Sequence, residues 1–271
     1  MNTTPVTLDM QGIAPDVVLK PYLLDNFPEI DMERTRPLVL VLPGGGYEFR
    51  SDREAEPVAL RLLGLGLSAC VVEYSFAPVR FPAALLQVYA AIAYAREHAR
   101  EWHIDPDKIL LMGFSAGGHL AGSAGVFWHK PHYAQRIGRT PEQVRPNGLV
   151  LGYPVITAGE HAHEQSFDNL LDDNRFVFSQ TVSLELQVSE HVPPTFLWHT
   201  WDDELVPVEN SLLMAGALRK AGVPTALHIF SRGQHGLSLS NDQVYGPEGL
   251  KDARADCARW ITLFDDWQRG L

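Results

Sequence analysis

Short apolar runs of strand length alternate with amphipathic helical patterns along most of the chain. The clearest run, 37–42 (PLVLVL), is apolar throughout, as expected of a strand buried on both faces of a sheet. Further strands are predicted at 67–74, 108–112, 148–152, 195–199 and 225–230, and helices at 54–63, 82–99 and 116–127. Because strands that alternate with helices form parallel sheets covered on both faces, the pattern predicts an α/β fold with a mostly parallel twisted sheet.

Two segments depart from this alternation. Between 154 and 192 the periodicity fails and polar and acidic residues accumulate, which indicates a short insertion over the C-terminal edge of the sheet. That segment is too short to form a hydrophobic core of its own, so we expect residues 1–271 to form a single domain. The segment 250–267 is predicted to be a helix with an apolar stripe made by Ala258, Ile261, Leu263, Phe264 and Trp267.

Charge and composition disfavour several functions. The 271 residues include 22 Lys and Arg against 33 Asp and Glu, and the net charge of −11 disfavours nucleic acid and anionic membranes as partners. No apolar run is long enough to span a bilayer, and the first residues lack the pattern of a signal peptide. Cys70 and Cys257 lie in apolar strand-like and helical segments, so we expect buried free thiols and a cytoplasmic location. Assembly into a homo-oligomer is left open.

The motif Gly113-Phe114-Ser115-Ala116-Gly117 matches G-x-S-x-G. Alone it is a weak signal, but the apolar strand KILLM ends directly before it and the helical run GGHLAGSAGVF begins directly after it. A nucleophile elbow needs this strand–turn–helix arrangement, with glycines because the sharp turn crowds the backbone on both sides of the serine. The motif therefore predicts that Ser115 is the nucleophile of an α/β-hydrolase fold.

A serine nucleophile needs a base and an orienting acid, which in this fold follow it in the order acid, then histidine. One predicted strand runs into the adjacent Asp202 and Asp203, and the next runs into His235 in a glycine-flanked loop. Both loops leave the sheet at the same edge as the elbow, where open α/β sheets place their sites. Only one of the two aspartates can receive the Nδ1–H of His235, because successive side chains point in different directions.

Backbone N–H groups should stabilise the negative oxygen of a tetrahedral intermediate. One donor is the N–H of Ala116, directly after the nucleophile. The second should come from the glycines that follow the strand at 37–42, where close approach of backbone to ligand is easy. Gly44 and Gly45 are the predicted donors, and Gly46 is a further candidate.

The other histidines are assigned structural roles. His119 lies one turn past Ser115 and is predicted to pack or to line a pocket, while His199 and His228 lie in strands. His161 and His163 have the spacing of a metal pair, but no third ligand is near, so solvated loop residues are expected. The sequence predicts neither a metal nor a cofactor.

Four segments together resemble the acetyl-xylan-esterase and carbohydrate-esterase-like branch of the α/β hydrolases: PGGGYEFRSDREAEPVALRLLGLGLSACVVEYSFAP, GFSAGGHLAG, FLWHTWDDELVPVENSLLMAGALRKAGVP and HIFSRGQHGLSL. The resemblance covers about 37–239. It implies hydrolysis of short-chain acyl esters, often O-acetyl groups on sugars, without a cofactor.

The resemblance also implies roles for single residues. The family's nucleophile corresponds to Ser115, the acid of its D-x-x-V-P pattern to Asp203, and its base to His235. Many relatives begin the oxyanion loop with His-Gly-Gly, and here Pro43 takes the place of the histidine. This departure removes a bracing side chain and leaves the backbone donors.

Two rival functions remain open at this stage, an amide or peptide hydrolase on the same fold and a binding protein that keeps the hydrolase shell without catalysis. The expected ligand is a small-molecule ester. Phe167, Phe176 and Phe178 in the insertion suggest aromatic walls around a partly covered site, and the alternative is that these residues only anchor the insertion to the sheet. An acyl tunnel is not expected, so acetyl esters should be cleaved faster than octanoyl esters.

Overall fold

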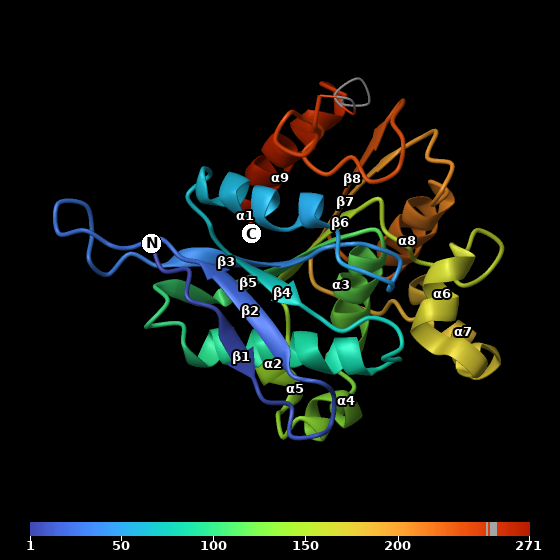
Figure 1. The fold of residues 1–271 in the computed structure, drawn as a ribbon, viewed down its shortest axis with the longest axis horizontal. Helices are drawn as coiled ribbons and strands as arrows, with labels where there is room; N and C mark the ends of the chain where they lie inside the picture. The colour runs from blue at the N-terminus through green and yellow to red at the C-terminus, as the bar shows by residue number, and fades with distance from the viewer. Residues whose placement is uncertain (248, 250–253) are drawn as a thin grey trace.

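The computed structural model describes residues 1–247, 249 and 254–271, and within them eight strands form one sheet (Figure 1). The strand order is β1-β2-β4-β3-β5-β6-β7-β8, with β1 and β2 antiparallel to their neighbours and the other pairs parallel. The strands are β1 (Val6–Leu8), β2 (Val17–Tyr22), β3 (Arg36–Leu42), β4 (Ser68–Glu73), β5 (Ile104–Phe114), β6 (Gly148–Gly152), β7 (Thr195–Thr200) and β8 (Thr225–Phe230).

Helices cover both faces of this sheet. Figure 1 shows α1 and α9 on one face and α2 and α3 on the other, with α8 beside them. Their bounds are α1 (Glu56–Leu63), α2 (Ala83–Glu97), α3 (Ala116–Phe127), α8 (Glu209–Lys220) and α9 (Trp260–Gln268). Two buried apolar clusters, one on each face, form the core. Burial is nearly complete in β3, in β6 and in residues 109–114 of β5, because helices cover both sides of these segments.

The register of the central strands aligns their carboxyl ends. Leu42 of β3 lies opposite Gly113 of β5, and Phe114 lies opposite Gly152 of β6. The segments that follow these three strands therefore leave the sheet side by side, at the edge where parallel α/β sheets bind ligands.

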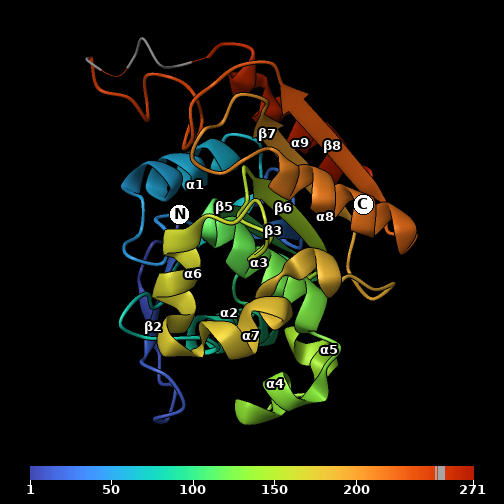
Figure 2. The ribbon, with the colours of Figure 1, turned by 90° about the vertical axis from the view of Figure 1, so that its right-hand side faces the viewer.

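The insertion at 154–192 is more ordered than its sequence pattern suggests. It holds α6 (Glu164–Leu171) and α7 (Arg175–Val182), with the short 3-10 helices η2 (Asp172–Asn174) and η3 (Leu184–Leu186). In Figure 2, which looks onto the carboxyl edge of the sheet, α6 and α7 lie in front of α3. Asn169 of α6 donates a hydrogen bond to the Gly46 carbonyl, 2.9 Å, so the insertion lies over the loop that follows β3.

Other elements also differ from expectation. The antiparallel strands β1 and β2 and the short helices α4 (Pro131–Arg136) and α5 (Pro141–Val144) were not predicted. The C-terminal helix begins at Trp260, after the 3-10 helix η5 (Cys257–Arg259), and not at 250. Residues 250–253 of that predicted helix lie outside the described residues.

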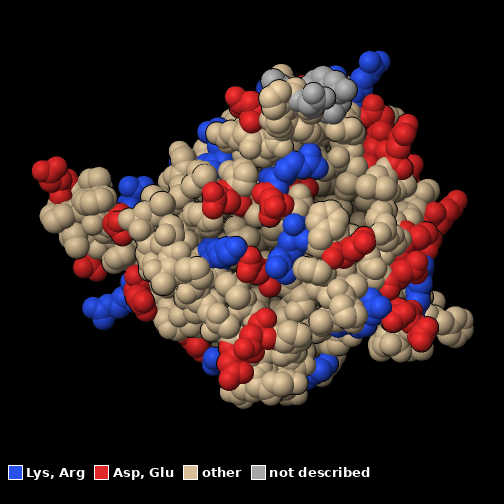
Figure 3. All heavy atoms as spheres, viewed as in Figure 1, with Lys and Arg blue, Asp and Glu red and all other residues tan. Residues whose placement is uncertain are grey.

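Three further findings concern membrane-spanning helices, the charges on the surface and the two cysteines. No helix in the described part of the chain is long and apolar enough to cross a membrane. On the face drawn in Figure 3, basic and acidic side chains are interspersed. Cys70 and Cys257 are both free and buried, as predicted.

Candidate active site

Ser115 occupies a sharp turn between β5, which ends at Phe114, and α3, which begins at Ala116. Its backbone angles are φ +53° and ψ −121°, a conformation that L-residues adopt only under constraint. A Cβ on Gly113 would lie 2.1 Å from the Gly117 carbonyl oxygen, and one on Gly117 would lie 2.1 Å from the Leu42 carbonyl oxygen. The elbow therefore needs both glycines of the motif, and it presents the Ser115 hydroxyl above the sheet.

The loops after β7 and β8 bring Asp203 and His235 to this serine. Nε2 of His235 is 2.8 Å from the Ser115 Oγ, and Nδ1 is 2.7 Å from Oδ2 of Asp203. With Nδ1–H donating to the carboxylate, Nε2 is left as an acceptor for the serine hydroxyl. The structure thus joins the three predicted residues in one chain of hydrogen bonds.

The carboxylate of Asp203 is held by donors on every side. Its Oδ1 accepts the N–H groups of Leu205 and Val206, each at 3.0 Å. Burial by itself would raise the pKa of Asp203, but hydrogen bonds from His199 and His235 and from the Val206 N–H outweigh it. The net result is a pKa well below the ordinary range for aspartate, so the carboxylate stays ionised beside the imidazole.

His199 is a neighbour of this carboxylate that the sequence pattern did not single out. Its Nε2 lies 3.3 Å from Oδ2 of Asp203 and 3.0 Å from the Val206 carbonyl oxygen, and its Nδ1 lies 2.8 Å from Oγ of Ser211. A proton on Nε2 satisfies both acceptors, and the Ser211 hydroxyl then donates to Nδ1. His199 closes the inner side of Asp203 and leaves His235 on the outer side.

Asp202 binds the backbone of the loop that carries His235. Its Oδ1 accepts the Gly233 N–H at 2.6 Å, while the Thr200 hydroxyl donates to the Gly233 carbonyl at 2.7 Å. Both contacts hold the loop that carries His235, and Asp202 itself is exposed. Of the two adjacent aspartates, the structure places Asp203 on the imidazole and Asp202 on the loop.

One of the backbone N–H groups predicted to be an oxyanion donor is already hydrogen-bonded to a side chain, and the others are not. We use the name oxyanion loop for residues 43–47, which follow β3. The Gly44 N–H donates to Oε2 of Glu54 at 2.7 Å, so the prediction that Gly44 supplies a donor is wrong. No acceptor among the described residues takes the N–H of Gly45, Gly46 or Ala116. Gly45 has φ +125° and Gly46 φ +62°, which favour glycine at both positions.

The pocket above Ser115, called the Ser115 pocket below, has a volume of about 280 Å³. Apart from the elbow, the His235 loop and the oxyanion loop, its wall is made by Glu48, Phe49, Ser51, Arg53, Glu54, His163, Gln165 and Leu205. The insertion therefore contributes His163 and Gln165, and Gln165 donates to Glu48 on the opposite rim at 2.6 Å. The rim is polar on the insertion side and apolar at Phe49 and Leu205.

The expectation of aromatic walls from the insertion is wrong. Phe167 is fully buried and its ring lies edge-on to His119, with centroids 5.4 Å apart. Phe178 packs on Phe81 at 5.9 Å, and Phe176 is 97% exposed. Phe176 and Phe178 belong to α7, which faces away from the Ser115 pocket, so its apolar residues anchor the insertion or face solvent.

Two histidines need a separate account. His119 is buried, with Nδ1 2.8 Å from the Tyr47 hydroxyl and Nε2 2.8 Å from the Val182 carbonyl oxygen, and burial lowers its pKa to about 4. The predicted packing role of His119 is confirmed, and the structure adds that it packs beneath the oxyanion loop, against Tyr47. His163 was expected to be a solvated loop residue, but it is half-buried in the Ser115 pocket with Nδ1 2.7 Å from Oγ of Ser166. The described residues contain no cluster of three or more His, Cys, Asp or Glu suited to a metal.

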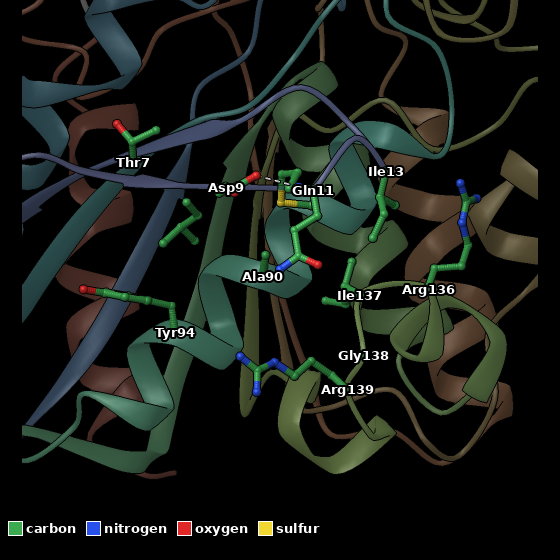
Figure 4. A pocket seen from close by; sticks show the side chains of 12 residues that line it. Thr7, Asp9, Gln11, Ile13, Ala90, Tyr94, Arg136, Ile137, Gly138 and Arg139 are labelled. Carbon is green, nitrogen blue, oxygen red and sulfur yellow. Dashed lines mark hydrogen bonds between the residues drawn. The ribbon is translucent and has the colours of Figure 1, made fainter.

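Larger hollows lie away from this constellation. One of about 420 Å³ lies between the β1–β2 loop, α2 and the turn after α4, and Figure 4 shows Tyr94, Gln11, Arg136 and Arg139 around it. Another, of about 640 Å³, lies at the opposite edge of the sheet beside Trp267. The described residues that line these two hollows include no serine, cysteine or histidine, so neither holds a nucleophile–base pair.

Comparison with known proteins places this geometry in a family. Residues 24–218, more than half of the chain, match the BD-FAE family, a range that holds Ser115 and Asp203 and ends before His235. The chain is 38% identical over 220 residues to endo-1,4-beta-xylanase B of Butyrivibrio fibrisolvens, covering 78% of this chain and 34% of that protein. It is 30% identical to the acetylxylan esterase of Xylanibacter ruminicola, covering 79% of this chain and 44% of that protein. The chain thus spans less than half the length of these two relatives.

Solved structures match over nearly the whole chain. An acetyl ester-xyloside bifunctional hydrolase from Caldicellulosiruptor lactoaceticus is 39% identical with a TM-score of 0.85, covering 99% of this chain and 96% of that one. The carboxylesterase Cest-2923 from Lactobacillus plantarum is 28% identical with a TM-score of 0.87, covering 100% and 98%. The elbow, the order of the site residues and these matches agree, and the chain belongs to the BD-FAE family of α/β hydrolases.

Proposed function

We propose that this chain is a serine carboxylic-ester hydrolase that cleaves short acyl esters, acetyl esters above all, through an acyl-enzyme. The observation that carries the proposal is the Ser115 Oγ at 2.8 Å from Nε2 of His235, whose Nδ1 is bonded to the ionised Asp203. This arrangement lets the imidazole take the serine proton as the hydroxyl attacks a carbonyl carbon.

The mechanism follows from the positions of the donors and acceptors. As the Ser115 Oγ bonds to the ester carbon, its proton passes to Nε2 of His235, and Asp203 stabilises the imidazolium. The former carbonyl oxygen becomes negative, and the N–H groups of Ala116, Gly45 and Gly46 are the donors that remain to receive it. Collapse breaks the bond to the alcohol oxygen, which takes the proton from Nε2. Water then repeats both steps on the acyl-enzyme and releases the acid.

The size and rim of the Ser115 pocket support a small acyl group and a polar alcohol. A volume of about 280 Å³ lies at the low end for ligand sites, and the rim offers Glu48, Gln165, His163 and Arg53 to hydroxyl groups. Two of the similar proteins are named for acetyl ester cleavage, one of them for acetylxylan. We therefore propose O-acetylated sugars as the substrate class. A cytoplasmic location also remains a proposal, supported by the two free buried thiols.

A substrate panel tests this function. Purified protein is assayed with p-nitrophenyl acetate, with acetylated xylo-oligosaccharides and, as the amide counterpart, with p-nitroacetanilide, and Ser115→Ala is the blank. We expect release of acetate from both esters and a far slower release of amine. Faster cleavage of the anilide would favour the amidase alternative, and binding of sugar esters without turnover would favour a non-catalytic role.

A further inference from the structure

Glu54 is a carboxylate buried beneath the candidate active site. It ends the 3-10 helix η1 (Asp52–Glu54), is only 3% exposed, and lies at the wall of the Ser115 pocket. Burial raises the pKa of Glu54, although hydrogen bonds from Tyr153 and Gly44 oppose this shift. The proposed mechanism uses no second acid here. Because desolvating a carboxylate costs free energy, its contacts should show what it contributes.

One carboxylate oxygen holds the oxyanion loop. Oε2 of Glu54 accepts the Gly44 N–H at 2.7 Å. Gly44 in turn packs directly on the elbow, since a Cβ there would lie 2.7 Å from the Phe114 carbonyl oxygen and 2.9 Å from the Ser115 Cβ. This bond fixes the orientation of the Pro43–Gly44 peptide, which lies one peptide unit before the N–H of Gly45, one of the proposed donors. Glu54 therefore anchors the start of the oxyanion loop directly beside the nucleophile.

The other oxygen holds the loop that carries His235. Oε1 of Glu54 accepts the Tyr153 O–H at 2.5 Å, and the same hydroxyl accepts the Ser238 N–H at 2.9 Å. The Ser238 hydroxyl donates to the Arg53 carbonyl at 2.6 Å, which closes a ring back to η1. The Tyr153 ring lies edge-on to the imidazole of His235, with centroids 5.0 Å apart and planes at 73°.

We propose that Glu54 is a positioning residue for ester hydrolysis, which sets the oxyanion loop through Gly44 and the His235 loop through Tyr153. The inference rests on the proposed function. Base and oxyanion donors come from different loops, and both must match one nucleophile. A misplacement of about 1 Å in such a site can cost about 100-fold in rate. A single buried carboxylate that is hydrogen-bonded to both loops holds them in a fixed position relative to each other.

The first test is Glu54→Gln. An amide offers one acceptor oxygen and a donor NH₂, so it cannot accept hydrogen bonds from both Gly44 and Tyr153. We expect kcat for p-nitrophenyl acetate to fall by about 10- to 100-fold with KM changed by less than about threefold. The matched control is Glu56→Gln, two residues away, because this exposed carboxylate accepts a hydrogen bond only from the Tyr22 hydroxyl among the described residues, at 2.9 Å, and does not line the Ser115 pocket. Its kcat should equal that of the unchanged protein.

A second readout separates positioning from general damage. A boronic acid forms a tetrahedral adduct on Ser115 and places one oxygen at the oxyanion donors, so its Ki should rise in Glu54→Gln by about the factor lost in kcat/KM. Rates are expressed per site titrated with a fluorophosphonate, which counts folded, reactive molecules. A purely structural role would lower the number of titrated sites and leave kcat per site and Ki unchanged, and that result would overturn the inference.

If Glu54→Gln does not fold, the variant Tyr153→Phe still tests the proposed role of Glu54. It removes one hydroxyl and leaves the bond between Glu54 and Gly44 in place, so the loss falls on the His235 loop alone. We expect kcat per titrated site to drop about tenfold, again with KM nearly constant. Unchanged kcat in this variant rejects the inference while the proposed function stands. A wild-type protein that cleaves no ester rejects both.

Discussion

Replacing Asp203 by asparagine should lower kcat by about 10⁴-fold, because the amide forces His235 into the wrong tautomer. Only an oxygen can accept the N–H groups of Leu205 and Val206, so the amide oxygen takes the place of Oδ1. The NH₂ then lies where Oδ2 was, 2.7 Å from Nδ1 of His235, and Nδ1 must become an acceptor. The proton moves to Nε2, which no longer accepts the serine proton. A factor of about 10⁴ corresponds to about 5 kcal/mol of transition-state stabilisation.

The matched control is Asp202→Asn. Its Oδ1 accepts only the Gly233 N–H in the described part of the chain, and an amide oxygen can do the same, so kcat should change by less than about tenfold. Both variants are assayed with p-nitrophenyl acetate, and thermal melting checks that each is folded. Equal losses would mean that the loop and not the tautomer matters. A larger loss in Asp202→Asn would refute the assignment of the acid.

Three further predictions concern the oxyanion loop, a buried acid and the acyl pocket. Gly44→Ala should lower kcat by about 100-fold, since its Cβ would lie 2.7 Å from the Phe114 carbonyl oxygen. Gly46→Ala meets no side chain or backbone atom closer than 3.9 Å and bears only the backbone strain of its φ of +62°, so it should lose less activity than Gly44→Ala, and similar losses would contradict this. The raised pKa of Glu54 means that its contribution to stability is full at low pH and is lost as the pH rises, so the Tm of Glu54→Gln relative to wild type should increase as the pH rises above about 4. A difference in Tm that stays flat with pH would refute the reasoning. For p-nitrophenyl esters, kcat/KM should fall from acetate to octanoate because the Ser115 pocket holds only about 280 Å³, and a rise would argue against a short acyl group.

The chain order of the candidate site could be predicted from the sequence because each residue follows a strand with a distinct pattern. Ser115 follows a buried apolar run and lies between glycines that the turn requires. Asp203 and His235 follow β7 and β8 at the same edge, so the topology of the sheet brings them together. The local pattern therefore sufficed for this part of the site.

The hydrogen bonds that hold the loops of the candidate site in place could not be predicted, because they form between segments that are distant in the sequence. Glu54 and Tyr153 are 99 residues apart and meet only when the loops after β3 and β6 are aligned by strand register. The direction of the Gly44 N–H depends on that same carboxylate, which is why Gly44 seemed as good a donor as Gly45. The sequence around His163 showed only a loop position and a spacing of two from His161, and its place in the Ser115 pocket depends on how the insertion folds back.

The unpredicted fold elements have similar causes. The short strand β1 pairs only at one side, and its three residues give too little alternation to read. In the insertion, α6 and α7 have eight residues each, and Asp172 breaks the pattern between them with φ +53°. Windows that short do not show a helical period, although the helices form once their apolar residues pack on the core.

The central claim, that Ser115 is the nucleophile of an acyl-enzyme, is tested most directly by labelling. Protein incubated with a fluorophosphonate is weighed by intact mass spectrometry and digested to locate the label. We predict one label per chain, on Ser115, with hydrolysis of p-nitrophenyl acetate lost in proportion. Ser115→Ala should take no label and lose turnover by several orders of magnitude while it melts like the wild type. Label on another residue, or more than a few per cent of activity left in Ser115→Ala, would contradict the account.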